Sequence, residues 1–269
     1  MSNRNNQANK QAARERLRAE RERQAKKDRL RRQLTVGGAI VGVLAIAGGI
    51  AVAVAGSGDD AASGPLVKPA NTSGTDGTTI TVGKKDAKNT LELFEDPRCP
   101  GCAAFEQTAG ATIEKDIKDG KYKASYHLGT FLDNNLQGTG SKNALNALGA
   151  SLNVSPDAFL KYKYALYSKE FHPDETGPDK FADDSYLIKV ADTVPALKGN
   201  AAFQKAVKSG TYDRWALGVS KAFDSVKDVK STPTIKLNGT VLGTKTPQGT
   251  SAPSSVAAFN SAVDKALKK

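Results

Sequence analysis

The chain has 269 residues, enough for one large domain or two small ones, and its formal net charge is +11. Residues 1–32 hold 12 basic and 4 acidic side chains, so the rest of the chain carries 27 basic against 24 acidic ones. The positive charge therefore belongs to the N-terminal tail, and this distribution argues against a folded nucleic-acid-binding domain.

A long uncharged run follows the basic tail of residues 1–33. Residues 34–56 are dominated by Val, Ile, Leu, Ala and Gly, and a helix of this length would span roughly 34 Å, enough for the hydrocarbon core of a bilayer. The positive-inside rule then predicts a single-pass cell-membrane protein with a cytoplasmic N-terminus and an extracytoplasmic C-terminal part. A cleaved signal peptide is the alternative, because Ala53-Val54-Ala55 fits a cleavage site.

The composition changes again after the apolar run. Residues 57–78 are rich in Gly, Ser, Ala, Asp and Thr and contain two prolines, which is typical of a flexible linker. We therefore expect one folded domain at residues 79–269. Its first part should contain strands at 79–82, 90–95 and 122–128, with a helix from about Cys99 to Lys118 before the last of them.

The middle of this domain, at about 135–228, is predicted to be helical. Good helix formers at helical spacing occur in five segments, at 142–152, 156–169, 180–190, 201–209 and 212–226. Strand signals return only at 234–237 and 240–242, around the hairpin turn Asn238-Gly239, and an amphipathic helix follows at 254–268. Strands on both sides of a helical block predict an α/β sheet with a helical insertion.

Both cysteines of the chain lie in one motif, Cys99-Pro100-Gly101-Cys102. Two cysteines three residues apart on a first helical turn face the same way and can form a disulfide. Cys99 would lie at the helix N-terminus, where unpaired backbone N–H groups and the helix dipole favour the thiolate and lower its pKa. Cys102 should be more buried. We therefore expect Cys99 to form mixed disulfides and Cys102 to resolve them.

Other residues of the motif bear on the reactivity of Cys99. Pro100 suits the first helical position, and Arg98 adds a positive charge nearby. Two other uses of the cysteines, a zinc site and an inert structural disulfide, fit the sequence less well. A zinc site lacks ligands at a suitable spacing, because His127 and His172 are the only histidines and stand far from each other and from the motif. An inert disulfide in so small a ring would add little stability. We expect no metal and no dissociable cofactor.

The segment Phe94–Glu106, with the motif at its centre, resembles the active-site strand, turn and helix of the DsbA-like branch of the thioredoxin superfamily. The resemblance is strongest to membrane-anchored bacterial members. Ser231-Thr232-Pro233-Thr234, before a strand and an Asn-Gly hairpin, is the second family mark. The resemblance implies a thioredoxin fold with a helical insertion. It also implies a cis peptide at Pro233 facing the disulfide, with the Thr232 backbone pairing with substrate main chain.

The resemblance further implies an extracytoplasmic thiol–disulfide oxidoreductase that introduces disulfides into exported proteins. A membrane quinone-linked partner of the DsbB or vitamin-K-epoxide-reductase type would reoxidise it. The family often keeps a buried acid on the strand before the motif as a proton relay. Glu92 and Glu95 are the candidates here, with an exposed position on the sheet as the alternative for each. Gly101 stands where strongly oxidising members carry His, so the disulfide should be less oxidising than theirs.

Two alternative functions stay open at this point. One is a membrane-tethered disulfide reductase or isomerase. Isomerases of this group dimerise through an added segment that residues 57–78 do not resemble, so a monomer is expected. The other is a non-catalytic binding or chaperone module with a structural disulfide. Away from the motif, we expect His127 to be structural, His172 to face solvent, and Trp215 to lie in the core.

Overall fold

The computed structural model describes residues 65–74, 76–246 and 249–268. The predicted basic tail, the predicted membrane segment at 34–56 and the first part of the predicted linker lie outside these residues. Among the residues that are described, no helix is both long and apolar enough to cross a membrane.

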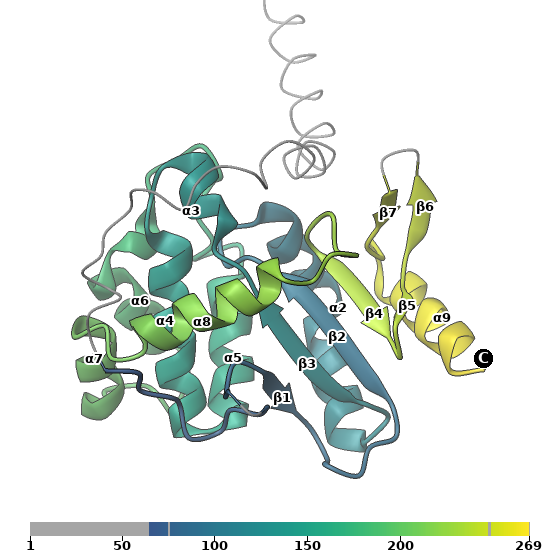
Figure 1. Ribbon diagram of the computed structural model, residues 1–269, viewed down its shortest axis with the longest axis horizontal. Helices are drawn as coiled ribbons and strands as arrows, with labels where there is room; N and C mark the ends of the chain where they lie inside the picture. Colours follow the sequence, from purple (N-terminus) through teal and green to yellow (C-terminus); the bar gives the residue numbers. More distant parts are fainter. Residues whose placement is uncertain (1–64, 75, 247–248, 269) are drawn as a thin grey trace, which may run out of the picture. The chain divides into compact units, whose positions relative to one another are not determined.

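A mixed five-stranded sheet organises the domain outside the helical insertion, in the order β1-β3-β2-β4-β5 (Figure 1). The central pair, β2 (Thr90–Glu95) and β3 (Lys123–Leu128), is parallel. The other strands join antiparallel, and they are β1 (Ile80–Val82), β4 (Thr234–Leu237) and β5 (Thr240–Val241). Two parallel strands need a crossover between them, and α2 (Pro100–Asp119) supplies it.

Strand β2 is the centre of the fold because both of its faces are covered. Leu91 and Leu93 belong to the main core with Phe105 of α2, which packs edge-on against Phe259 of α9 (Val256–Leu267). Phe94 points to the opposite face and packs with Phe223 of α8 (Asp213–Asp224). Figure 1 shows α2 behind the sheet and α8 crossing in front of it. Successive side chains of β2 thus point to opposite faces, and apolar side chains on both faces are typical of a strand at the centre of a covered sheet.

The helical insertion lies between β3 and β4, as predicted, but it begins earlier than 135. It consists of α3 (Phe131–Leu136), α4 (Gly140–Val154), α5 (Pro156–Leu166), η1 (Lys180–Ala182), α6 (Asp184–Ala191), α7 (Ala201–Lys208) and α8. Helix α3 was not predicted. The helix predicted at 180–190 is divided, because the Asp183 side chain accepts a hydrogen bond from the Ser185 N–H and starts a new helix there.

Two further segments differ from the sequence prediction. Part of the predicted linker packs on the insertion: Asn71 donates to the Leu152 carbonyl at 2.8 Å, and Trp215 donates through Nε1 to the Gly77 carbonyl at 2.7 Å. Residues 65–74 and 76–78 are therefore part of the folded domain. A hairpin of β6 (Thr244–Thr246) and β7 (Gly249–Ser251), which lacks the apolar alternation of a buried strand, also went unpredicted.

Candidate active site

The first turn of α2 places the reactive sulfur. Asp96 accepts the Arg98 N–H through Oδ1 at 2.9 Å and the Cys99 N–H through its own carbonyl at 3.0 Å, which makes a tight turn between β2 and α2. Cys99 is the N-cap of α2, and its Sγ accepts the Cys102 N–H at 3.4 Å. Pro100 takes the first helical position, where a missing N–H costs nothing.

The loop before β4 closes over this sulfur. The Thr232–Pro233 peptide is cis, as the family resemblance implied. The Thr232 hydroxyl donates to Cys99 Sγ at 3.4 Å, and the Thr232 carbonyl lies 3.7 Å from the same sulfur. A Cβ at Gly101 would lie 3.2 Å from Pro233 Cδ, so glycine lets the loop approach the motif. The structure thus brings together Cys99, Gly101, Thr232 and Pro233.

The two thiols, both free, have opposite electrostatic settings. The pKa of Cys99 is lowered, first by a hydrogen bond from the Cys102 side chain and also by the Thr232 hydroxyl, against the opposing effect of burial. The pKa of Cys102 is raised well above its usual value, because the side chain is fully buried and because the Cys99 sulfur already holds charge. An apolar cluster surrounds both, formed by Ala103, Leu132 and Tyr167 with Phe131 and Leu136 at its edge.

Glu95, one of the two predicted relay candidates, lies fully buried beneath the motif. This burial rules out the alternative expectation that Glu95 is exposed on the sheet. Lys163 of α5 lies 2.9 Å from Glu95 and 2.7 Å from Glu106 of α2, so one ammonium joins two carboxylates. Burial raises the pKa of Glu95 to about 7, although Lys163 opposes the shift, and the Glu95 charge contributes to the raised pKa of Cys102.

Glu92, the other candidate, lies on the opposite face of β2 and does not approach the cysteines. Its carboxylate is half-exposed and lies 3.7 Å from His127 Nε2. His127 is structural, as expected: its ring stacks on Phe94, and burial lowers its pKa to about 4. Glu92 therefore drops out as a group that tunes the cysteines, because neighbouring positions of a strand alternate between faces.

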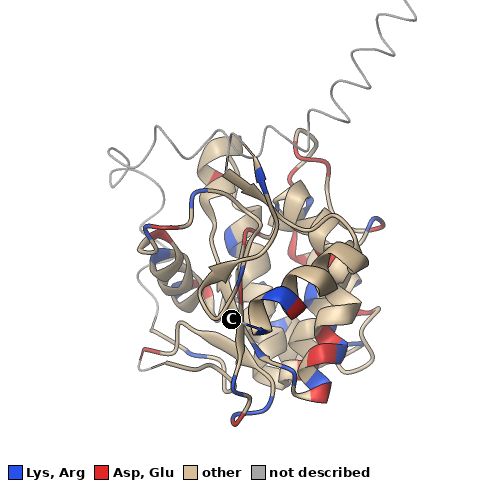
Figure 2. Ribbon diagram, turned by 90° about the vertical axis from the view of Figure 1, so that its right-hand side faces the viewer, with Lys and Arg blue, Asp and Glu red and all other residues tan. Residues whose placement is uncertain are grey.

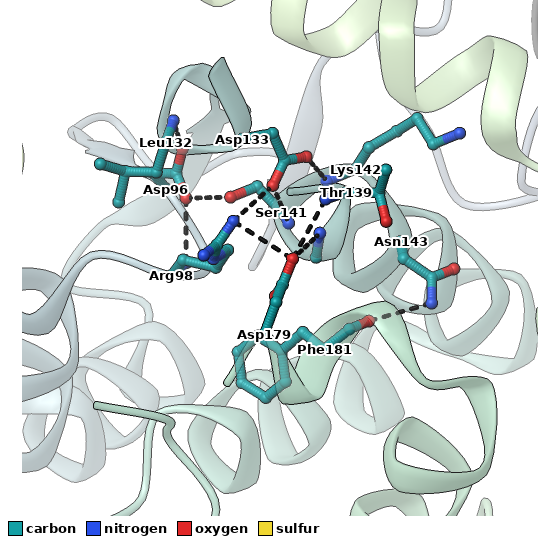
Figure 3. Close-up of polar contacts among 11 residues, drawn as sticks. Asp96, Arg98, Leu132, Asp133, Thr139, Ser141, Lys142, Asn143, Asp179 and Phe181 are labelled. Atoms are coloured by element: carbon teal, nitrogen blue, oxygen red, sulfur yellow. Dashed lines mark hydrogen bonds and ion pairs between the residues drawn. The ribbon is translucent and has the colours of Figure 1, made fainter. Parts of the chain in front are cut away.

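Asp96 is a buried acid that the sequence interpretation missed. It has no exposed surface, and burial raises its pKa to about 7. Besides the Arg98 N–H, it accepts hydrogen bonds from the Ser141 hydroxyl at 2.7 Å and the Leu132 N–H at 3.1 Å (Figure 3). Both of these donors belong to the insertion. Asp96 thus joins the start of α2 to α3 and α4.

Two more side chains of the insertion hold the same turn by its backbone. The Tyr167 hydroxyl donates to the Asp96 carbonyl at 3.0 Å, and His172 Nε2 lies 3.2 Å from the Pro97 carbonyl, to which it can only donate. His172 stacks on Tyr167, and burial lowers its pKa to about 4. The prediction that His172 faces solvent is therefore wrong. Trp215 lies in the core of the insertion, as predicted.

Arg98 does not extend toward the cysteines or into water. Its guanidinium is buried and pairs with Asp133 at 3.1 Å and with Asp179 at 3.3 Å (Figure 3). No sequence pattern indicates these partners, which lie 35 and 81 positions away along the chain. Among the described residues there is no group of three or more His, Cys, Asp or Glu side chains arranged to hold a metal ion.

Comparisons with known proteins point to one family. The family model described as thioredoxin matches residues 75–265. Reduced DsbG from Mycobacterium tuberculosis superposes with a TM-score of 0.57 at 25% identity, over 71% of this chain and 88% of that one. Oxidised DsbA from the same organism gives 0.56 at 25% identity, over 71% and 93%. MdbA, a thiol-disulfide oxidoreductase from Actinomyces oris, shares the fold, with a TM-score of 0.59 at 22% identity over 74% and 89%.

One curated relative is named as a protein kinase and not as an oxidoreductase. The serine/threonine-protein kinase PknE of Mycobacterium tuberculosis is 31% identical over 122 residues, which are 44% of this chain and 21% of the kinase. The match thus spans about a fifth of the length of that relative.

Proposed function

The chain belongs to the thioredoxin family, and from this premise we propose that it is an extracytoplasmic oxidoreductase that introduces disulfides into exported proteins through Cys99 and Cys102. Its fold is that of the DsbA-like thiol–disulfide oxidoreductases. The observation that carries the proposal is the contrast between the two thiols: Cys99 has a lowered pKa at a helix N-terminus, whereas Cys102 is fully buried with a raised pKa.

This contrast supports an oxidising direction. A substrate thiolate would attack Cys99 Sγ in the oxidised protein and break the Cys99–Cys102 bond, whose electron pair goes to Cys102. A second substrate thiolate would then attack the substrate sulfur of the mixed disulfide and release Cys99 as a thiolate. A disulfide is a stronger oxidant when its reduced form is stabilised. The hydrogen bonds to Cys99 Sγ from Cys102 and Thr232 provide such stabilisation.

The surroundings of the sulfurs suggest roles for two more groups. We assign the Thr232 backbone to pairing with the substrate main chain, because its carbonyl already lies beside Cys99 Sγ. We assign Glu95 to proton exchange with Cys102, whose raised pKa makes it take a proton when it leaves the disulfide. A carboxyl group with a pKa of about 7 can both give and accept that proton near neutral pH.

The cellular setting is part of the proposal. The apolar run at 34–56 would anchor the protein in the cell membrane with the catalytic domain outside. A quinone-linked membrane protein of the DsbB or vitamin-K-epoxide-reductase type would reoxidise Cys99 and Cys102, and a monomer suffices for this cycle. Figure 2 shows basic and acidic residues interspersed along the described chain, which fits protein substrates better than nucleic acid.

The direct test is a redox equilibrium of Cys99 and Cys102 against glutathione, combined with refolding of a reduced protein substrate. We expect a potential well above that of thioredoxin and faster recovery of the native substrate. In parallel, C102S lacks the thiol that can attack Cys99 Sγ from within the protein and release the substrate, so it should accumulate mixed disulfides with exported proteins through Cys99, and C99S should not. A potential near that of thioredoxin, without oxidase activity, would instead favour the membrane-tethered reductase, which Gly101 in place of a histidine makes the second candidate.

A further inference from the structure

A buried ion-pair cluster next to Cys99 has no part in the disulfide exchange described above. Arg98 Nη1 bonds Asp133 Oδ1 at 3.1 Å and Asp179 Oδ2 at 3.3 Å, and the three side chains are only 6%, 11% and 19% exposed (Figure 3). A guanidinium shared between two carboxylates fixes their geometry, because leaving any one of these buried charges unpaired is costly. Arg98 directly precedes Cys99 in the chain, so holding the Arg98 side chain in place also restricts the position of the Cys99 backbone.

The same two carboxylates hold the beginning of α4. Asp133 accepts two backbone N–H groups of the first turn, both at 2.8 Å, and Asp179 accepts two more at 3.0 and 3.1 Å. The four donors are Thr139, Gly140, Ser141 and Lys142. These are N–H groups that a helix N-terminus otherwise leaves unpaired. Arg98 is therefore bound, through one side chain from α3 and one from the segment before η1, to the longest helix of the insertion.

The local sequence makes room for these contacts. A Cβ at Gly138 would lie 2.3 Å from Asp179 Oδ2 and 2.6 Å from Arg98 Nη1, and a Cβ at Gly140 would lie 2.0 Å from Asp179 Oδ1. Such distances are far inside van der Waals contact, so a side chain at either position would push Asp179 away. The two glycines thus allow the carboxylate to approach both the helix start and the guanidinium.

We propose that Arg98, Asp133 and Asp179 form a clamp that holds the turn before Cys99 against the insertion and thereby fixes the Cys99 sulfur at the N-terminus of α2. Arg98 is then a positioning residue and not a positive charge that stabilises the thiolate directly. Its charge is already opposed by two carboxylates, so the cluster as a whole is negative and would disfavour a nearby thiolate through space. The inference rests on the proposed function only in taking Cys99 as the reactive thiol.

The two explanations predict different signs for a pair of substitutions. The measurement is the pKa of Cys99 in the reduced full-length protein, from ultraviolet thiolate absorbance and from the pH dependence of alkylation. If the clamp positions Cys99, R98M and D179N both break it, and both raise that pKa, by about 1 unit or about tenfold less thiolate at a given pH. If Arg98 acts by charge alone, R98M raises the pKa and D179N, which removes a negative charge, lowers it.

Two further variants keep the test decisive. R98K retains the charge, but its shorter side chain does not carry the ammonium to the position of Nη1 between Asp133 and Asp179, so the clamp predicts a shift like that of R98M. R98K replaces R98M if that variant does not fold. D133N replaces D179N if that variant does not fold, and the clamp predicts that it also raises the pKa of Cys99. The control is K121M, which breaks the Lys121–Asp264 pair at 3.1 Å just beyond the end of α2 and should leave the pKa of Cys99 unchanged.

Opposite shifts in R98M and D179N, or no shift in either folded variant, would overturn the clamp. Urea denaturation of each variant shows that the protein is folded where the pKa is measured. Because the titration needs no substrate, it also separates the two proposals. A protein that fails to transfer disulfides would refute the proposed function while leaving the clamp to be judged on these shifts.

Discussion

The thioredoxin part and the helical insertion contribute to the site in different ways. The thioredoxin part consists of the five-stranded sheet with α2, α9 and the loop before β4. The groups that touch the Cys99 sulfur come from this part, namely the first turn of α2 and the Thr232 hydroxyl. The insertion instead supplies the partners of the surrounding charges and carbonyls, from Lys163 under the motif to Tyr167 at the preceding turn. The comparison shows which part of the molecule acts on the thiol. Apart from the two carboxylates that bind Arg98, changes in the insertion should mainly affect stability, whereas changes at Thr232 should mainly affect the pKa of Cys99.

The largest effect is expected at Lys163. K163M leaves Glu95 and Glu106 buried without their cation, and breaking a buried ion pair costs about 3–5 kcal/mol in the free energy of unfolding at neutral pH. Urea denaturation of the reduced protein measures it. The matched control is K161M on the same helix, whose exposed pair with Asp157 should contribute about 0.3–0.5 kcal/mol. Equal effects of the two substitutions would contradict a supporting role for the insertion.

The next effect is a pH dependence of stability that arises at Asp96. Burial raises its pKa to about 7 in the folded protein, above the value near 4 of an unfolded chain. The folded state therefore binds the proton more tightly, and the resulting stability is present below about pH 4 and lost as the pH rises toward 7. D96N removes this titration, so its free energy of unfolding should fall less between these pH values, by about 3 kcal/mol. Parallel curves for the two proteins would exclude Asp96 as the source.

At Thr232 the expected effect falls on reactivity. T232V removes the hydroxyl that donates to Cys99 Sγ, and the pKa of Cys99 should rise by about 1 unit, since a hydrogen bond to the charged form favours that form. Alkylation rates across pH measure the shift. T232S keeps the hydroxyl and serves as the control. A T232V protein that loses much stability but keeps the Cys99 pKa would reverse the comparison between the two parts.

The smallest effect is expected at the single tryptophan. Trp215 is buried in the insertion and donates to the Gly77 carbonyl, and it does not belong to the apolar cluster around the cysteines. Reduction of the disulfide should therefore change its fluorescence little. A large change in intensity on reduction would mean that the redox state of the motif reaches into the insertion, and W215F would show whether the signal comes from this residue.

The elements of the sheet could be predicted well, because strands carry their periodicity locally. β2 was predicted at its observed bounds, and the same alternation shows in retrospect that Glu95 shares the core face of Leu91 and Leu93 while Glu92 does not. The two cysteines could be placed from their motif, which needs only a few neighbouring residues to specify it, whereas the cis proline was implied by the family resemblance.

The rest of the site depends on long-range contacts that no local pattern reveals. Lys163 has the sequence setting of an ordinary helix residue, and only the packing of α5 against α2 places it between two acids. The partners of Arg98 come from two separate segments of the insertion. Helix α3 is only six residues long, too short for its periodicity to be recognised. Sequence patterns therefore could not predict the residues of the insertion that bind the charged groups around the motif.

The attachment of residues 70–74 and 76–77 to the insertion has a mechanical consequence. A pull on the chain N-terminal to this segment meets the Asn71 hydrogen bond to the end of α4 and the Trp215 bond to Gly77 before it reaches β1. Tension would thus be carried first by the helices of the insertion. As long as these contacts hold, β2 and the first turn of α2, which carries the cysteine motif, would stay unloaded, and thiol exchange could proceed while the N-terminal chain is under force.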